Sequence, residues 1–95
     1  MERLTFWPDY SGALLWTDRG ERVPLEDIAL SGDLVERARR WVERYDDSKL
    51  PWEATRDDAW LAEGQRLFAE LRRELESQGI DLVSDEDFWA ADARG

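Results

Sequence analysis

Residues 58–83 read DAWLAEGQRLFAELRRELESQGIDLV, in which a long amphipathic segment is followed by a glycine and a short apolar run. The apolar side chains recur at helical spacing, which predicts a helix over 56–78 with one face turned towards a core. Gly79 suits the end of that helix, because glycine adopts the left-handed backbone conformation there at little cost. The apolar run at 80–83 predicts a strand. The residues on the apolar helix face are Trp60, Leu61, Gly64, Leu67, Phe68, Leu71 and Leu75.

Upstream, the chain predicts a second helix over 32–45 and a strand pair over 2–17, where two runs of strand formers are separated by turn residues. Residues 22–23 suggest a short further strand. We therefore expect an α+β fold, a small and mostly antiparallel sheet of three or so strands with two helices packed on one face. The expected order is β-β-α-α-β, followed by a short C-terminal helix over 85–91. The apolar face of the upstream helix holds Leu34, Val35, Ala38, Trp41, Val42 and Tyr45.

The alternation of residues along the N-terminal strands predicts which side chains reach the core. Successive side chains of a strand point to opposite faces, so the helices can cover only half of them. Because two helices cover only one face, we expect the other face, with Trp7 and Leu15, to lack a cover. One alternative function is therefore a structural protein that forms a homodimer through that face. The residues expected on the helix side are Leu4, Phe6, Leu14 and Trp16, and those expected on the outer side are Thr5, Trp7, Ala13 and Leu15.

The length of 95 residues fits a single domain over 1–95, with a linker at 46–54 between the helices. The chain has no Cys and no His, which excludes thiol nucleophiles, imidazole acid–base catalysis and zinc sites built from those ligands. We expect no cofactor. The sequence shows no disulfide framework, no signal-peptide pattern and no apolar run long enough to cross a bilayer, so a cytoplasmic location is expected.

The carboxylate clusters are candidates for acid–base catalysis or metal binding. Their three clusters lie at predicted helix ends, and acids in a first turn are favoured by the helix dipole alone. No segment has the spacing of a calcium-binding loop. We therefore expect no catalytic residue and no metal site, and a carboxylate-dependent hydrolase is the remote alternative. The clusters are Asp46-Asp47, Asp57-Asp58 and Asp85-Glu86-Asp87.

The formal net charge of −10 favours a basic protein partner and disfavours nucleic acid and anionic membranes. Several aromatic side chains have no place on the predicted helix faces, and exposed aromatic residues often anchor protein interfaces. Acidic neighbours would steer a basic partner to such anchors. The alternative is that Trp52 and Trp89 fold back over a thin core. The candidate partner-binding residues are Trp7, Tyr10, Asp46, Asp47, Trp52, Asp57, Asp58, Asp85, Glu86, Asp87 and Trp89.

A set of short motifs comprises Phe6-Trp7-Pro8-Asp9-Tyr10, Leu15-Trp16, Leu30-Ser31 with Leu34 and Trp41, Trp60, Glu63-Gly64, and Leu71 with Glu74-Leu75. With these motifs the chain resembles, over most of residues 3–83, small acidic proteins of unassigned function from actinobacteria and other bacteria. The resemblance implies a bacterial cytoplasmic protein and supplies no catalytic residues. Similar small acidic proteins also occur among the immunity proteins of bacterial toxin systems. The function expected is a non-enzymatic binding protein, in the manner of an immunity protein or antitoxin that inhibits a basic partner.

Overall fold

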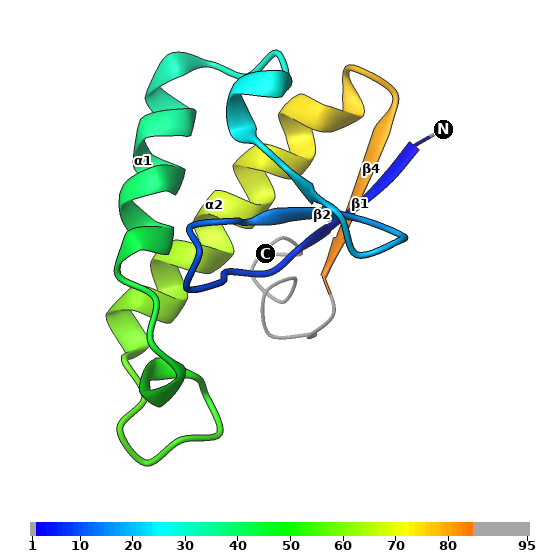
Figure 1. Cartoon of the computed structure of the whole chain (residues 1–95). Coiled ribbons are helices and arrows are strands. Elements are labelled where there is room, and N and C mark those ends of the chain that lie inside the picture. Colours follow the sequence, from blue (N-terminus) through cyan, green and yellow to red (C-terminus); the bar gives the residue numbers. More distant parts are fainter. Residues whose placement is uncertain (1, 85–95) are drawn as a thin grey trace.

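A computed structural model describes residues 2–84 of the chain as an α+β fold with two α-helices (Figure 1). The short strands precede both helices, and a last strand returns to the sheet, as predicted. The predicted helix over 85–91 lies outside the described residues. The elements are β1 (Glu2–Phe6), β2 (Leu15–Thr17), β3 (Arg22–Val23), η1 (Leu25–Asp27), α1 (Gly32–Glu43), η2 (Asp47–Lys49), α2 (Asp58–Glu76) and β4 (Ile80–Ser84).

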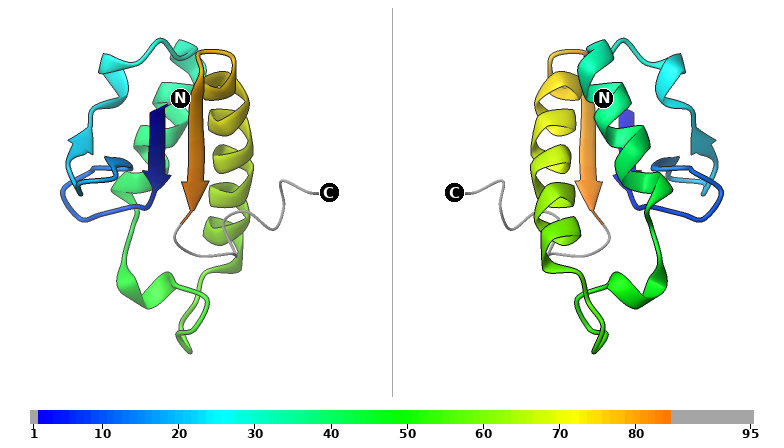
Figure 2. Two further views of the ribbon diagram at one scale, coloured as in Figure 1. Left: turned by 90° about the vertical axis from the view of Figure 1, so that its right-hand side faces the viewer. Right: turned by 90° about the vertical axis from the view of Figure 1, so that its left-hand side faces the viewer.

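The sheet has four strands in the order β3-β2-β1-β4, and it is mixed. The pairings of β1 with β2 and of β2 with β3 are antiparallel, whereas β4 lies parallel to β1. The prediction of three or so strands, mostly antiparallel, is therefore correct for the N-terminal part and wrong for β4. The reason is the path of α2, which carries the chain back to the end of the sheet where β1 starts (Figure 2). From there β4 can only run beside β1 in the same direction.

Both helices cover the same face of the sheet, as predicted, and Figure 2 shows the other face without a helix over it within residues 2–84. The predicted facing of β2 is wrong. Leu15 lies opposite Phe6 and is fully buried, whereas Trp16 lies opposite Thr5 on the outer face. Leu14 is also buried, but it precedes the regular ladder, so alternation begins one residue later than expected. A shift of one residue exchanges the two faces of a strand.

The core between the sheet and the helices is centred on Trp41 of α1 and Trp60 of α2. Their rings stack with centroids 4.3 Å apart and planes inclined by 9°. Each indole N–H donates to the backbone carbonyl of the other residue, at 2.8 Å from Trp41 and 3.0 Å from Trp60. Phe6 packs against Trp41 at 5.7 Å and links the stacked pair to β1. The two tryptophans therefore join both helices and the sheet at a single point.

The helix ends differ slightly from the predicted limits. α1 ends two residues earlier and α2 is two residues shorter at each end, while β4 extends one residue beyond the predicted 80–83. α2 begins where the Asp57 carboxylate accepts the N–H of Trp60 at 3.0 Å, a hydrogen bond that satisfies one donor of the first turn. Before α1, the backbone N–H and the hydroxyl of Ser31 both donate to Glu74 of α2, at 2.9 and 3.0 Å. This side-chain bridge holds the start of α1 against the end of α2.

A second polar bridge joins the middle of the two helices. Arg37 of α1 donates to both carboxylate oxygens of Glu70 of α2, at 2.9 and 2.5 Å. Asp33 lies one turn before Arg37 and pairs with it at 3.5 Å. The hydrogen bonds from Arg37 hold the pKa of Glu70 below its usual value. A carboxyl group with a lowered pKa stabilises the fold above its unfolded pKa and loses that contribution in acid.

We expect Glu70→Gln to lower the free energy of unfolding at neutral pH by about 0.5–1 kcal/mol, because the pair is a third exposed and screened by water. The difference from the parent should shrink once the pH falls below the usual glutamate pKa of about 4.3, and it should disappear once the pH falls below the lowered pKa of Glu70, where the carboxyl is protonated in the folded protein as well. Urea unfolding at several pH values measures both effects. Glu76→Gln, which removes a helical pair with Arg72, is the control and should cost only about 0.3 kcal/mol. A Glu70→Gln difference that persists in acid would contradict this assignment.

Gly79 turns the chain from α2 into β4 with a φ of +78°, a conformation that other residues adopt only with strain. Gly79→Ala should lower the free energy of unfolding by about 1–2 kcal/mol. Gly32 is the matched control, since it starts α1 with an ordinary φ and an added Cβ would meet nothing within 4 Å. Gly32→Ala should leave stability unchanged or raise it by about 0.4–1 kcal/mol. Thermal unfolding followed by circular dichroism compares them, and equal effects would refute the explanation.

Candidate functional site

The candidate site lies at the end of the molecule where the β1–β2 turn meets the connector between α1 and α2. Tyr10 and Trp52 are the large apolar side chains most exposed to solvent within residues 2–84, at 65% and 56%. Tyr10 belongs to the turn and Trp52 to the connector. The sequence predicted both as partner-binding residues, and the structure shows both exposed. For Trp52, the alternative of a lid folded over the core is therefore wrong.

Tyr10 is held against the connector by two contacts. Its hydroxyl accepts the backbone N–H of Asp47 at 2.9 Å, and its ring lies 4.9 Å from that of Tyr45. The Tyr45 hydroxyl in turn donates to the Asp47 carboxylate. Burial, and then the hydrogen bond to Asp47, raise the pKa of Tyr45 above its usual value. The turn and the connector, 37 residues apart in sequence, thus form one surface.

The β1–β2 turn is shaped by its own polar residues. Asp9 accepts the backbone N–H of Ser11 at 2.9 Å, and the contacts with Ser11 hold the pKa of Asp9 below its usual value. The backbone also closes on itself, since Gly12 N–H donates to the carbonyl of Asp9 at 3.0 Å. This turn presents Tyr10 outwards with its ring against the connector. An ionised carboxylate therefore stands beside the exposed Tyr10 side chain.

The acids of the connector cap its local structure. Asp46 accepts the N–H of Ser48 at 2.9 Å at the start of η2, and hydrogen bonding with Ser48, first through its side chain and then through its backbone N–H, keeps the pKa of Asp46 below its usual value. Asp57 caps α2, as described above. Asp58 pairs with Arg56 at 3.2 Å. These roles agree with the expectation that acids at helix ends are favoured by local electrostatics.

The charge of the connector is nevertheless strongly negative. Residues 46–58 include five acids and two bases, and both bases contact neighbouring groups. Lys49 donates to the carbonyl of Arg44 at 2.7 Å and lies 5.8 Å from the Trp60 ring. Within residues 2–84 the structure gives no salt bridge to Asp46, Asp47 or Glu53. We define the connector surface as Asp9, Tyr10, Tyr45, Asp46, Asp47, Trp52 and Glu53.

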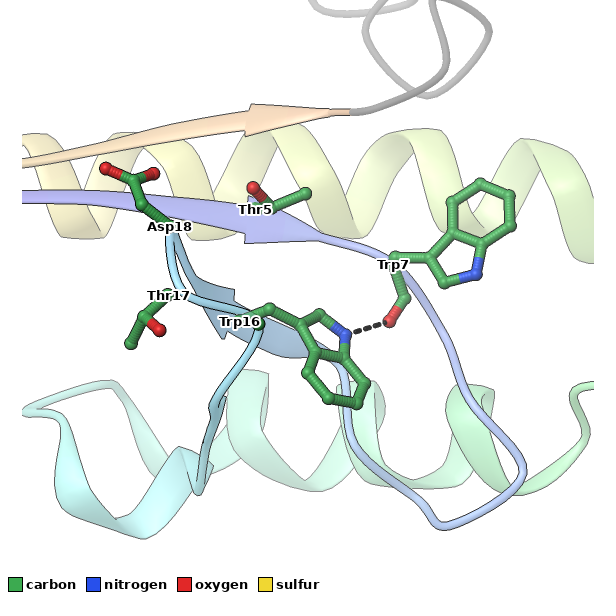
Figure 3. Close-up of a pocket in the computed structure, with 6 residues that line it drawn as sticks. Thr5, Trp7, Trp16, Thr17 and Asp18 are labelled. Carbon is green, nitrogen blue, oxygen red and sulfur yellow. Dashed lines mark hydrogen bonds between the residues drawn. The ribbon is translucent and has the colours of Figure 1, made fainter.

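Trp7 does not belong to the connector surface. It follows β1 and lines a hollow on the outer face of the sheet, together with Trp16 and Asp18 (Figure 3). The predicted acids Asp57 and Asp58 flank the connector surface at the start of α2. The remaining predicted residues, Asp85, Glu86, Asp87 and Trp89, lie outside the described residues.

The sequence interpretation missed Tyr45 and Asp9 as members of the site. Tyr45 belongs to the apolar face of the helix predicted over 32–45, and that position predicts a core residue. The sequence around Asp9 predicts only a turn. A signal was present for Asp9, because Asp followed two residues later by Ser is typical of a turn closed by the carboxylate. No local signal in the sequence brings Tyr10 to Asp47, since that contact depends on the tertiary fold.

No cluster of three or more acids, within residues 2–84, is arranged to hold a metal ion. In the same residues, neither helix combines the length and apolar character needed to cross a membrane.

Comparisons with known proteins add no relative. No protein-family model, no curated protein and no solved structure matches this chain. The resemblance to small acidic bacterial proteins therefore stays a prediction.

Proposed function

We propose that this protein acts without catalysis, by binding a basic protein partner through the connector surface. The observation that carries the proposal is the position of Tyr10 and Trp52. They are the most exposed large apolar side chains of the described residues, and both belong to this one acidic end of the molecule. Exposed aromatic side chains of this kind are typical anchors of protein interfaces.

Charge supports a basic partner. Asp46, Asp47 and Glu53 are exposed in the same connector as Trp52, and the chain as a whole carries a net charge of −10. An acidic rim around aromatic anchors raises the rate of encounter with a positively charged protein and disfavours acidic ones. An inhibitor of the immunity or antitoxin type would work in this way, by covering a positively charged active site of its partner.

The acids favour binding over catalysis. A general acid at neutral pH needs a raised pKa, which burial or a like charge can supply. The pKa values of Asp9, Asp46 and Glu70 are instead lowered by donors that stabilise the ionised form. Carboxylates that stay ionised suit charge recognition better than proton transfer.

Affinity capture from the native host tests the proposal. Three baits are compared: the parent protein, Trp52→Ala, and Ile28→Ala as an apolar truncation at the residue directly after η1, a segment away from the connector surface (Figure 1). We expect the parent and Ile28→Ala to retain the same basic protein, and Trp52→Ala to lose it. The retained protein should be released by moderate salt, because exposed charges are screened over about 10 Å at 0.1 M. Retention of an acidic protein, or equal retention by all three baits, would contradict the proposal.

A further inference from the structure

The outer face of the sheet carries a second surface, separate from the connector surface. A hollow of about 360 Å³ lies there over β1 and β2. Figure 3 shows Thr5 in the middle of this hollow, with Trp7 on one side and Asp18 on the other. The side chain of Trp16 flanks it from β2. The residues lining the hollow are Thr5, Trp7, Trp16, Thr17, Asp18 and Gly20.

Hydrogen bonds hold the Trp16 indole and the Trp7 backbone of this hollow in place before any ligand arrives. Trp16 lies opposite Thr5 in the β1–β2 ladder, which fixes its side chain on the outer face. Its indole N–H donates to the backbone carbonyl of Trp7 at 2.9 Å (Figure 3). The backbone N–H of Trp7 donates to the carbonyl of Leu14 at 2.9 Å. A ligand that packs on Trp16 would lose little binding free energy to ordering of that side chain.

Asp18 supplies the charge of the hollow. Its side chain is exposed, and within residues 2–84 the structure gives its carboxylate no hydrogen bond and no salt bridge. A neighbouring hollow of about 440 Å³ shares Thr17 and Asp18 with the first and is lined by three acids and two bases. One of those bases, Arg3, already pairs with Asp81 at 3.6 Å. The charge around Asp18 therefore favours a cation.

We propose that this hollow binds an arginine side chain of the basic partner. A guanidinium group is planar and weakly hydrated, stacks on indole rings and donates two parallel N–H groups to a carboxylate. Figure 3 shows Trp7 on one side of the hollow and Asp18 on the other, so the apolar stem of the arginine would pack along an indole while its guanidinium pairs with the Asp18 carboxylate. The inference rests on the proposed function only for the basic character of the partner, because the hollow and the connector surface share no residue.

A free probe tests the hollow without the partner. N-acetyl-arginine amide is titrated into the full chain, and the indole N–H signals are followed by nuclear magnetic resonance after assignment with single Trp→Phe variants. We expect saturable shifts of the Trp7 and Trp16 signals with a dissociation constant in the millimolar range, since one side chain offers few contacts. The citrulline analogue keeps the shape and lacks the charge, and it should bind about fivefold more weakly or worse. The lysine analogue should bind more weakly than arginine, because it cannot stack as a plane.

Two charge-removing variants distinguish binding of the probe at the hollow from a general effect of the protein's negative charge. Asp18→Asn should weaken the arginine probe by about tenfold, because it removes a charged hydrogen-bond acceptor. Asp27→Asn removes the same charge from an exposed position in η1 and should leave binding unchanged. Circular dichroism checks that each variant is folded. Trp52→Ala, which tests the proposed function, should also leave binding of this probe unchanged.

Three results would overturn the arginine site. The first is equal binding of the arginine and citrulline probes. The second is equal loss of affinity in Asp18→Asn and Asp27→Asn. The third is a shift of the Trp7 and Trp16 signals on dilution of the protein alone, with no response to the probe, which would assign the face to a second copy of the chain.

Discussion

Replacing Trp41 by alanine is expected to lower the free energy of unfolding by about 3–5 kcal/mol, a large part of the 5–15 kcal/mol that stabilises a typical domain. Trp41 is fully buried, stacks on Trp60 and packs against Phe6 of β1. The substitution removes the ring that joins α1, α2 and the sheet. It also leaves the backbone carbonyl of Trp60 without the indole N–H that it accepts at 2.8 Å. A buried carbonyl without a donor adds its own cost.

Chemical unfolding in urea, followed by circular dichroism, measures this effect. Trp60→Phe keeps an aromatic ring but removes the N–H donated to the Trp41 carbonyl, together with part of the stacked ring surface, and it should cost about 1–3 kcal/mol. Trp52→Ala is the matched control, because that side chain is 56% exposed, and it should change stability by no more than about 0.5 kcal/mol. A loss in Trp41→Ala no larger than in Trp52→Ala would show that the stacked pair does not organise the core.

The second large effect concerns binding. Once the partner is identified, Trp52→Ala should weaken its affinity by about 30-fold or more, the loss typical of an aromatic interface anchor. Tyr10→Phe tests the hydrogen bond that holds the turn against the connector, because it keeps the ring and removes the hydroxyl that accepts the Asp47 N–H at 2.9 Å. We expect a loss of about fivefold, caused by a less fixed turn.

Isothermal titration calorimetry at two salt concentrations measures these affinities. The apolar control is Ile28→Ala, directly after η1, and the charge control is Asp27→Asn within η1; neither should change the affinity. The parent should bind more weakly at high salt, since screening weakens the attraction between the acidic rim and a basic partner. An affinity that is insensitive to both Trp52→Ala and salt would remove the connector surface from the interface.

Periodicity predicted much of the fold. The helical spacing of apolar residues predicted the ends of α1 and α2 to within two residues. The residues that it assigned to the core side of α2, from Trp60 to Leu75, are buried. Gly79 ends α2 with the positive φ that its position suggested. These features depend on neighbours a few residues apart, so they are visible in the sequence itself.

The errors arose where the structure depends on distant parts of the chain. In a strand as short as β2, an alternating pattern does not determine which side chains face the core. The pairing of β2 with β1 places Leu15 on the buried face and Trp16 on the outer face. The parallel pairing of β4 depends on where α2 returns the chain, which no local pattern contains. For the same reason the contact of Tyr10 with Asp47 was invisible, although Tyr10 and Asp47 were separately chosen as candidates.

Hydrogen–deuterium exchange on the full chain, with and without the captured basic partner, tests most directly whether this protein recognises that partner through its acidic connector end. We predict that binding slows exchange in the β1–β2 turn at residues 8–12 and in the connector at residues 45–58. Unchanged exchange in both segments while the partner is bound would contradict the account.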